Sequence, residues 1–188
     1  MMRVLKWVVA VALMGGAVGC KSKTESKAEN DRSSAIAAPG AAPPSSVPGP
    51  PEGVGLDGVN MPISQLLGTE RQSRPSDTLS AEQVFSAFEK GGLTLADKTQ
   101  VLGRTIGASF CENAHTPAGV VFSVCEFKDA ATATKGRDYS LRTFGKALPD
   151  RDLLIKQKTL LTITRGGPGG PAQTESKTAT QIFQGLSG

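Results

Sequence analysis

The sequence is poor in the residues that stack on nucleic-acid bases or bind metals. Its 188 residues include one Trp, one Tyr, one His and three Cys. Such a chain offers no aromatic platform for single-stranded nucleic acid and too few nitrogen and sulfur ligands for a structural zinc site. The formal charge is +4, but the Lys and Arg residues are scattered and form no basic tract. We therefore expect no nucleic-acid partner, no metal and no cofactor.

Sequence motifs of catalysis are also absent. The chain contains no GxSxG, HExxH or Walker-type pattern. The glycine-rich segment 166–171 (GGPGGP) lacks the Lys-Ser/Thr of a phosphate-binding loop, and its prolines remove amide donors, so a flexible surface loop is predicted. We expect a protein that is not an enzyme. One alternative stays open, an envelope enzyme with a site around His115 and either Glu112 or Glu126.

The longest apolar run is too short to cross a bilayer. The uncharged stretch 7–19 has 13 residues, which as a helix would span about 20 Å, against about 30 Å for a hydrocarbon core. It follows Arg3 and Lys6 and ends in small residues. This pattern predicts a signal peptide over residues 1–19. Its removal leaves 19 basic against 17 acidic residues, a net charge of +2.

The segment Ala17-Val18-Gly19-Cys20 resembles the lipobox of bacterial lipoproteins. The resemblance implies cleavage before Cys20 and lipidation of Cys20, so that the protein is held on a membrane by a lipid anchor in the cell envelope. Two or three acyl chains anchor stably where one does not. Lys21 follows the cysteine instead of Asp, which implies the outer membrane in a Gram-negative host, facing the periplasm or the cell surface. The resemblance covers about 20 residues and implies nothing about the domain that follows.

Residues 20–76 read as a disordered linker. The part to residue 32 mixes charges of both signs, and 33–58 is rich in Ala, Pro, Gly and Ser, so neither can bury enough apolar surface to fold. The stretch 59–67 interrupts the linker with five apolar residues. There Asn60 can cap a short helix with Pro62 in its first turn. This helix either packs back on the domain or docks a partner.

The remaining residues, 77–188, suit one small domain. Ser80 and Gln83 form a capping box, Leu79 and Val84 a hydrophobic staple, and a glycine pair ends the helix predicted over 81–90. Strands are predicted over 99–111, where Gly103 and Gly107 favour bulges or close packing, and over 120–128. The segment 153–165 is one long strand or, as we favour, a hairpin that turns at 157–158.

Two further helices complete the domain. Asp129 can cap a helix that runs to about residue 147, in which Gly136 is a weak point. Its apolar stripe consists of Ala130, Ala133, Leu141, Phe144 and Leu148. A last helix over 175–186 places Ala179, Ile182, Phe183 and Leu186 on one side. The predicted fold is α+β, a small antiparallel sheet with helices packed on one face, in the order α-β-β-α-β(-β)-α after the disordered tether.

Cys111 and Cys125 bracket the connection between the first two predicted strands, and residue 118 lies at their midpoint. Antiparallel pairing about that point places them opposite each other, within reach of a bridge. Export would place them in an oxidising compartment. We therefore predict a structural disulfide, which leaves Cys20 as the anchor.

The sequence favours a tethered, non-catalytic binding or accessory domain with an unknown protein partner in the envelope. The partner would contact the sheet face, the loop around His115, or both. A purely structural envelope component is a second alternative. Eight basic residues are also candidates for a face toward anionic lipid or polysaccharide, against an ordinary solvated surface. They are Lys128, Lys135, Arg137, Arg142, Lys146, Lys156, Lys158 and Arg165.

Overall fold

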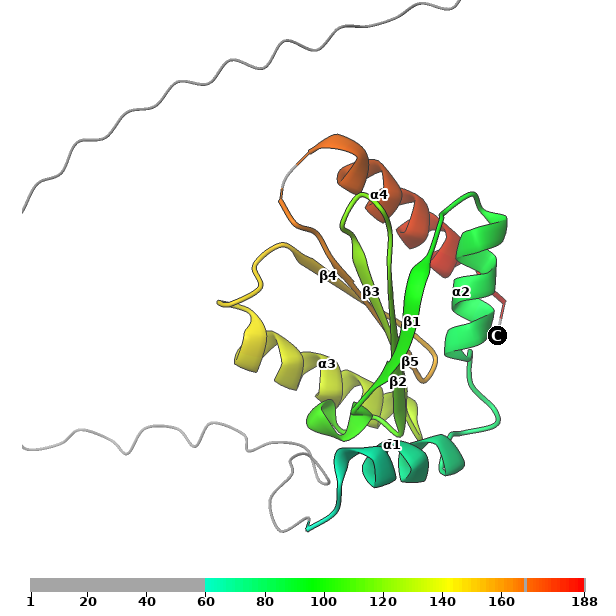
Figure 1. Cartoon of the computed structure of the whole chain (residues 1–188), viewed down its shortest axis with the longest axis vertical. Coiled ribbons are helices and arrows are strands. Elements are labelled where there is room, and N and C mark those ends of the chain that lie inside the picture. Colours follow the sequence, from blue (N-terminus) through cyan, green and yellow to red (C-terminus); the bar gives the residue numbers. More distant parts are fainter. Residues whose placement is uncertain (1–59, 168, 188) are drawn as a thin grey trace, which may run out of the picture. The chain divides into compact units, whose positions relative to one another are not determined.

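The computed structural model describes residues 60–167 and 169–187 (Figure 1). The predicted signal peptide, Cys20 and the linker up to residue 59 lie outside these residues. No helix in the described ranges is long and apolar enough to span a bilayer. The elements are α1 (Ile63–Gln72), α2 (Ala81–Lys90), β1 (Ala96–Val101), the 3-10 helix η1 (Gly103–Ile106), β2 (Phe110–His115), β3 (Val121–Glu126), α3 (Ala130–Phe144), β4 (Arg151–Lys156), β5 (Thr159–Thr164) and α4 (Gly170–Gly185).

The described strands form one sheet in the order β1-β2-β3-β5-β4, and every neighbouring pair is antiparallel. This confirms the predicted α+β class. The favoured hairpin is confirmed as well, because β4 and β5 are joined at Gln157-Lys158, with Gln157 at a φ of 54°. β1 and β4 are therefore the two margins of the sheet.

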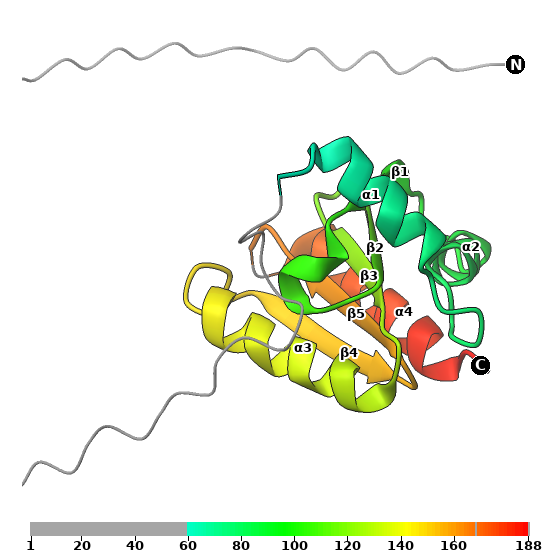
Figure 2. The same ribbon diagram turned by 90° about the horizontal axis from the view of Figure 1, so that it is seen from below.

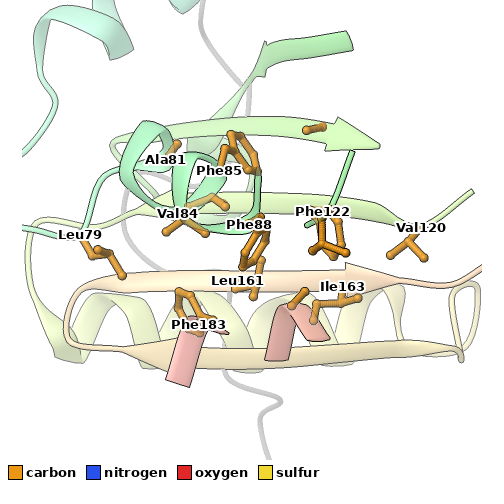
Figure 3. Packing of buried hydrophobic residues seen from close by; sticks show 14 of the residues in the cluster. Leu79, Ala81, Val84, Phe85, Phe88, Val120, Phe122, Leu161, Ile163 and Phe183 are labelled. Carbon is orange, nitrogen blue, oxygen red and sulfur yellow. The ribbon is translucent and has the colours of Figure 1, made fainter. Parts of the chain in front are cut away.

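Helices cover both faces of the sheet, not one face as the sequence predicted. Phe122 and Val124 of β3 lie in a core with α2 and α4, which Figure 3 shows around Phe85, Phe88 and Phe183. Cys125 belongs to a second cluster that includes Ala133 of α3. Because side chains alternate along a strand, these clusters lie on opposite faces. The central strands β3 and β5 are apolar on both sides, so both faces need a cover.

The predicted strand 99–111 is three elements in the structure, β1, η1 and the start of β2. Gly107 has a φ of 77°, which turns the chain after η1. A Cβ on Gly103 would stand 3.0 Å from the carbonyl oxygen of Ala108. The two glycines therefore permit the close packing that the sequence suggested. The chain turns at η1, so the predicted strand is interrupted.

The predicted start of α2 is confirmed. Ser80 Oγ accepts from Gln83 N–H, and Gln83 Oε1 accepts from Ser80 N–H, which completes the capping box. Leu79 and Val84 are buried in the same core, as a hydrophobic staple requires.

The start of α3 is confirmed, but of the predicted apolar stripe only Ala133 is buried. Asp129 accepts from the amide of Thr132 and caps the helix, which ends at Phe144 instead of 147. Leu141, Phe144 and Leu148 are 46%, 38% and 44% exposed. The buried face of α3 instead consists of small residues, Ala133, Gly136 and Ser140. Small side chains let the helix lie close to the sheet.

α4 begins at Gly170, five residues before the predicted start, so the end of the glycine-rich segment is helical. Pro171 lies in the first turn, where its missing N–H costs no hydrogen bond. Ala179 and Phe183 are buried in the core with α2, and Ile182 and Leu186 pack against it, so the predicted inner side of the helix is confirmed.

Helix α1 lies within the segment that the sequence assigned to the linker. It follows Pro62 and not the predicted cap Asn60. It packs back on the domain, because the carboxylate of Glu70 accepts from Gly103 N–H and Arg104 N–H at 2.9 and 3.0 Å. The described fold therefore starts before the predicted boundary at residue 77.

Candidate functional site

The structure does not bring His115 together with Glu112 or Glu126. His115 ends β2 opposite Val121, whereas Glu126 is at the other end of the same two strands, opposite Phe110. Glu112 lies an odd number of residues from His115, so the two side chains leave opposite faces of the sheet. The nearest carboxylate recorded for His115 is that of exposed Asp97, with Nε2 3.4 Å from Oδ2.

Glu126 instead belongs to an ion-pair network with the partly exposed Arg74 and the exposed carboxylate of Glu82. Glu126 has no exposed surface, and its carboxylate accepts from Arg74 Nε at 3.1 Å and from the amide of Ala81 at 2.8 Å. Arg74 also pairs with both carboxylate oxygens of Glu82 at 2.6 Å, and its guanidinium lies 3.9 Å from the ring centroid of Phe110. This network fastens the α1–α2 connection to the sheet.

The same network shifts the pKa values of nearby carboxyls. The Arg74 guanidinium holds the pKa of Glu82 down at about 2. Burial, followed by the charge of Glu82, raises the pKa of Glu112. Glu112 lies on the same face of the sheet as the network and has no side-chain hydrogen bond within the described residues, whereas the charge of Glu126 is balanced by Arg74. Arg74 was missed by the sequence analysis because it lies in a segment that reads as linker.

The two domain cysteines meet across β2 and β3. Cys111 and Cys125 are directly opposite in register, with Cα atoms 4.1 Å apart and the sulfur atoms bonded. Both are buried. The pairing predicted from their symmetric spacing is present, and it links β2 to β3 on the face of the sheet that α3 covers.

The eight basic residues do not form a single cationic face. Arg137, Lys158 and Arg165 are paired with Asp138, Asp77 and Asp152. Lys156 donates instead to the carbonyl of Gln184 on α4. Since these contacts lie on different faces of the sheet, the candidate lipid- or polysaccharide-facing surface gains no support, and the ordinary solvated surface is favoured.

One margin of the sheet has free hydrogen-bonding groups. Within the described ranges, β4 pairs only with β5. Phe127 N–H donates to Lys158 C=O. By the antiparallel alternation, the main-chain N–H and C=O groups of even-numbered residues in β5 are directed toward β3, and those of odd-numbered residues are directed toward β4. By the antiparallel alternation, the main chain of Leu153 and of Ile155 points away from the sheet.

The other margin is less suited to strand addition. The register of β1 shifts between Ala96 and Thr99, and the exposed residues at this irregularity are the charged Asp97 and Lys98. Bulges and charges of this kind discourage an added strand. β4 pairs with β5 in continuous register over its whole length. The β4 margin is therefore the better edge for a partner.

A groove of about 600 Å³ runs along β4 between α3 and α4. Figure 2 shows β4 at the margin of the sheet, between the yellow α3 and the red α4. Residues 151–154 line its floor, Leu141 lines one side, and the polar face of α4 from Gln173 to Gln181 lines the other. The exposed side chains of Phe144 and Leu148 follow Leu141 on α3 and its C-terminal turn.

Two cations in the groove lack a carboxylate partner among the described residues. Arg151 donates to the carbonyls of Leu148 and Ser140 and to the Ser140 hydroxyl. Burial lowers the pKa of Arg151, but an arginine stays charged at neutral pH. Lys177 is exposed on α4 and takes part in no ion pair within the described ranges. The acid on the groove floor, Asp152, is already paired with Arg165.

The sequence of α4 contains a pattern that is related to this groove. Gln173, Lys177, Thr180 and Gln181 recur at helical spacing, opposite the apolar residues that face the core. Such a polar face ordinarily meets only solvent. The groove follows from the position of this face beside an open strand, which no pattern within α4 records.

Comparisons with protein-family models, curated proteins and solved structures found no match. Within these residues, no cluster of three or more His, Cys, Asp or Glu side chains is placed to hold a metal ion.

Proposed function

We propose that this protein is a lipid-anchored binding module of the bacterial cell envelope, and that it binds a partner protein at the β4 groove. The lipobox-like segment that ends at Cys20 supports the address. The disulfide between Cys111 and Cys125 is compatible with an oxidising compartment. In a Gram-negative host the anchor would lie in the outer membrane, facing the periplasm or the cell surface.

The observation that carries the proposed binding role is the open edge of β4 beside its groove. Helices cover both faces of the sheet, so a partner can no longer be expected on a bare sheet face. The edge offers main-chain donors and acceptors at Leu153 and Ile155, and the groove offers room for the side chains of an extended segment. Addition of a strand to a free sheet edge is a recurrent mode of protein recognition.

Mass spectrometry of the protein isolated from its native membrane tests the anchor. We expect a mature N-terminal peptide that starts at Cys20 and carries diacylglycerol on its sulfur. A Cys20→Ser variant is the control, and it should accumulate as the uncleaved, unlipidated precursor. A native N-terminus at another residue, without lipid, would refute the anchor.

Site-specific photocrosslinking in intact cells tests the binding surface. A photoreactive residue replaces Leu141, in the groove, or Thr99, at the opposite margin of the sheet. We expect Leu141 to give one discrete adduct that Thr99 does not give, with the crosslink mapped to an extended segment of one identified envelope protein. Equal adducts from both positions, or none from Leu141, would contradict the proposal.

The second part of this experiment uses a variant in which strand addition to β4 is blocked. Leu153→Pro removes the outward N–H of β4, and proline is tolerated on edge strands. We expect the Leu141 adduct to disappear while the melting temperature shows that the variant remains folded. If the adduct persists in the folded variant, the partner does not bind through the strand edge.

A further inference from the structure

A strand added to β4 would have two different sides. Even-numbered residues of β4 face α4, since Asp152 pairs with Arg165 and Lys156 reaches Gln184 C=O. Odd-numbered residues face α3, since Arg151 contacts Ser140. A neighbouring strand continues the same alternation, so its side chains would point in turn toward α4 and toward α3.

The two sides differ in polarity. On the α3 side, Leu141 lines the groove, and Phe144 and Leu148, which follow it in the chain, are exposed apolar side chains as well. On the α4 side, the groove wall is polar, and Lys177 is its charged group. An occupant that complements both sides therefore alternates apolar and polar residues.

The charge of the groove selects among such occupants. Arg151 and Lys177 have no carboxylate partner within the described residues, while the groove acid Asp152 is neutralised by Arg165. A second acid, Asp150, is near Arg165 but leaves the local balance positive. A cationic partner would be repelled, and a carboxylate beside Lys177 would gain a charge-assisted hydrogen bond.

We infer that the β4 groove binds an extended acidic segment of a partner protein, in which Asp or Glu alternates with apolar residues. The segment adds to the sheet beside β4, with its carboxylates toward Lys177 and its apolar side chains toward Leu141 and Phe144. This inference rests on the proposed function, since it names the chemistry of the partner at the same groove.

Two end-capped eight-residue peptides serve as probes, one alternating Val and Glu and the other alternating Val and Lys. The mature chain from Cys20 is titrated with each peptide in detergent micelles by calorimetry. We expect the Glu peptide to bind about tenfold or more tightly than the Lys peptide, the size of one charged hydrogen bond. Hydrogen exchange of the Leu153 and Ile155 amides should slow on binding, because an added strand would form hydrogen bonds to them.

Charge reversal in the groove provides the matched control. Lys177→Glu should remove the preference for the Glu peptide, whereas Lys90→Glu, in the last turn of α2 and outside the groove, should leave it unchanged. Equal binding of both peptides by the unaltered chain would overturn the inference. So would binding without protection of Leu153, or a concentration-dependent dimer that Leu153→Pro abolishes, since the occupant would then be a second copy.

The two levels of the proposal can fail separately. If the Leu141 adduct forms in cells but the Glu peptide does not bind, the acidic occupant is refuted and the binding role stands. If neither is observed, both are refuted.

Discussion

Gly136 of α3 lies so close to the ring of Phe127 that a Cβ at position 136 would stand 2.6 Å from Phe127 Cε1. It would also come within 2.7 Å of the carbonyl oxygen of Ile106. Neither neighbour is the far end of a flexible side chain. The glycine therefore sets how closely α3 lies against the sheet.

Gly136→Ala should destabilise the fold in spite of the better helix propensity of alanine. Overpacking of this kind costs about 1–3 kcal/mol. The matched control is Gly68→Ala in α1, where the new Cβ meets no atom within 4 Å. The control should raise stability by up to about 1 kcal/mol. Urea denaturation of both variants measures the difference, and equal effects would show that α3 can move away from Phe127.

Replacement of both Cys111 and Cys125 by alanine should lower the unfolding free energy by about 3 kcal/mol, the chain-entropy value for a loop of this size. The double variant leaves no lone thiol in the domain, which would be free to cross-link to another chain. Thermal unfolding should show a melting temperature lower by about 10 °C or more. An unchanged melting temperature would mean that the strand pairing of β2 and β3 alone fixes this region.

Loss of Arg74 should be costly because it leaves the fully buried Glu126 without its counter-charge. For Arg74→Met we expect about 3–5 kcal/mol of destabilisation. The double variant Arg74→Met with Glu126→Gln should be more stable than Arg74→Met alone. Chemical denaturation of the two single variants and the double variant gives the coupling energy, and simple additivity would contradict the pairing.

Glu82 should make the protein sensitive to acid. Its pKa is held at about 2 in the folded chain against an ordinary value of 4.5. Because the folded pKa is the lower one, the stabilisation is present above pH 4.5 and is lost as the pH falls through about 2. Glu82→Gln should therefore reduce the loss of unfolding free energy over this range. Glu89→Gln, which removes the other ion-paired acid of α2, is the comparison variant, and an identical acid profile for both would exclude a special role for Glu82.

The elements that the sequence predicted correctly depend on interactions between near neighbours. Ser80 with Gln83 and Asp129 with Thr132 form caps within one turn, so their residue types are enough to locate two helix starts. The cysteine pair could be predicted from symmetric spacing about a turn. Each of these relationships is contained in a short stretch of chain.

The elements that were missed depend on contacts between distant segments. Leu141 and Ala133 both fit a helical stripe, but the bulk of Phe127 decides that the small residues face the sheet. Arg74 lies in a segment whose composition predicts a linker, and its role depends on Glu126 of β3, which is distant in the sequence. The groove arises in the same way, from the order of strands that leaves β4 at a margin.

Helix α1 is attached to one margin of the sheet and not to the other. Glu70 and Arg71 tie α1 to η1 and β1, at the margin of the sheet opposite β4. Four strand spacings separate these margins, about 19 Å. The described chain therefore enters the sheet at the β1 margin, and α1 leaves the β4 margin, at the far end of the strand order, uncovered.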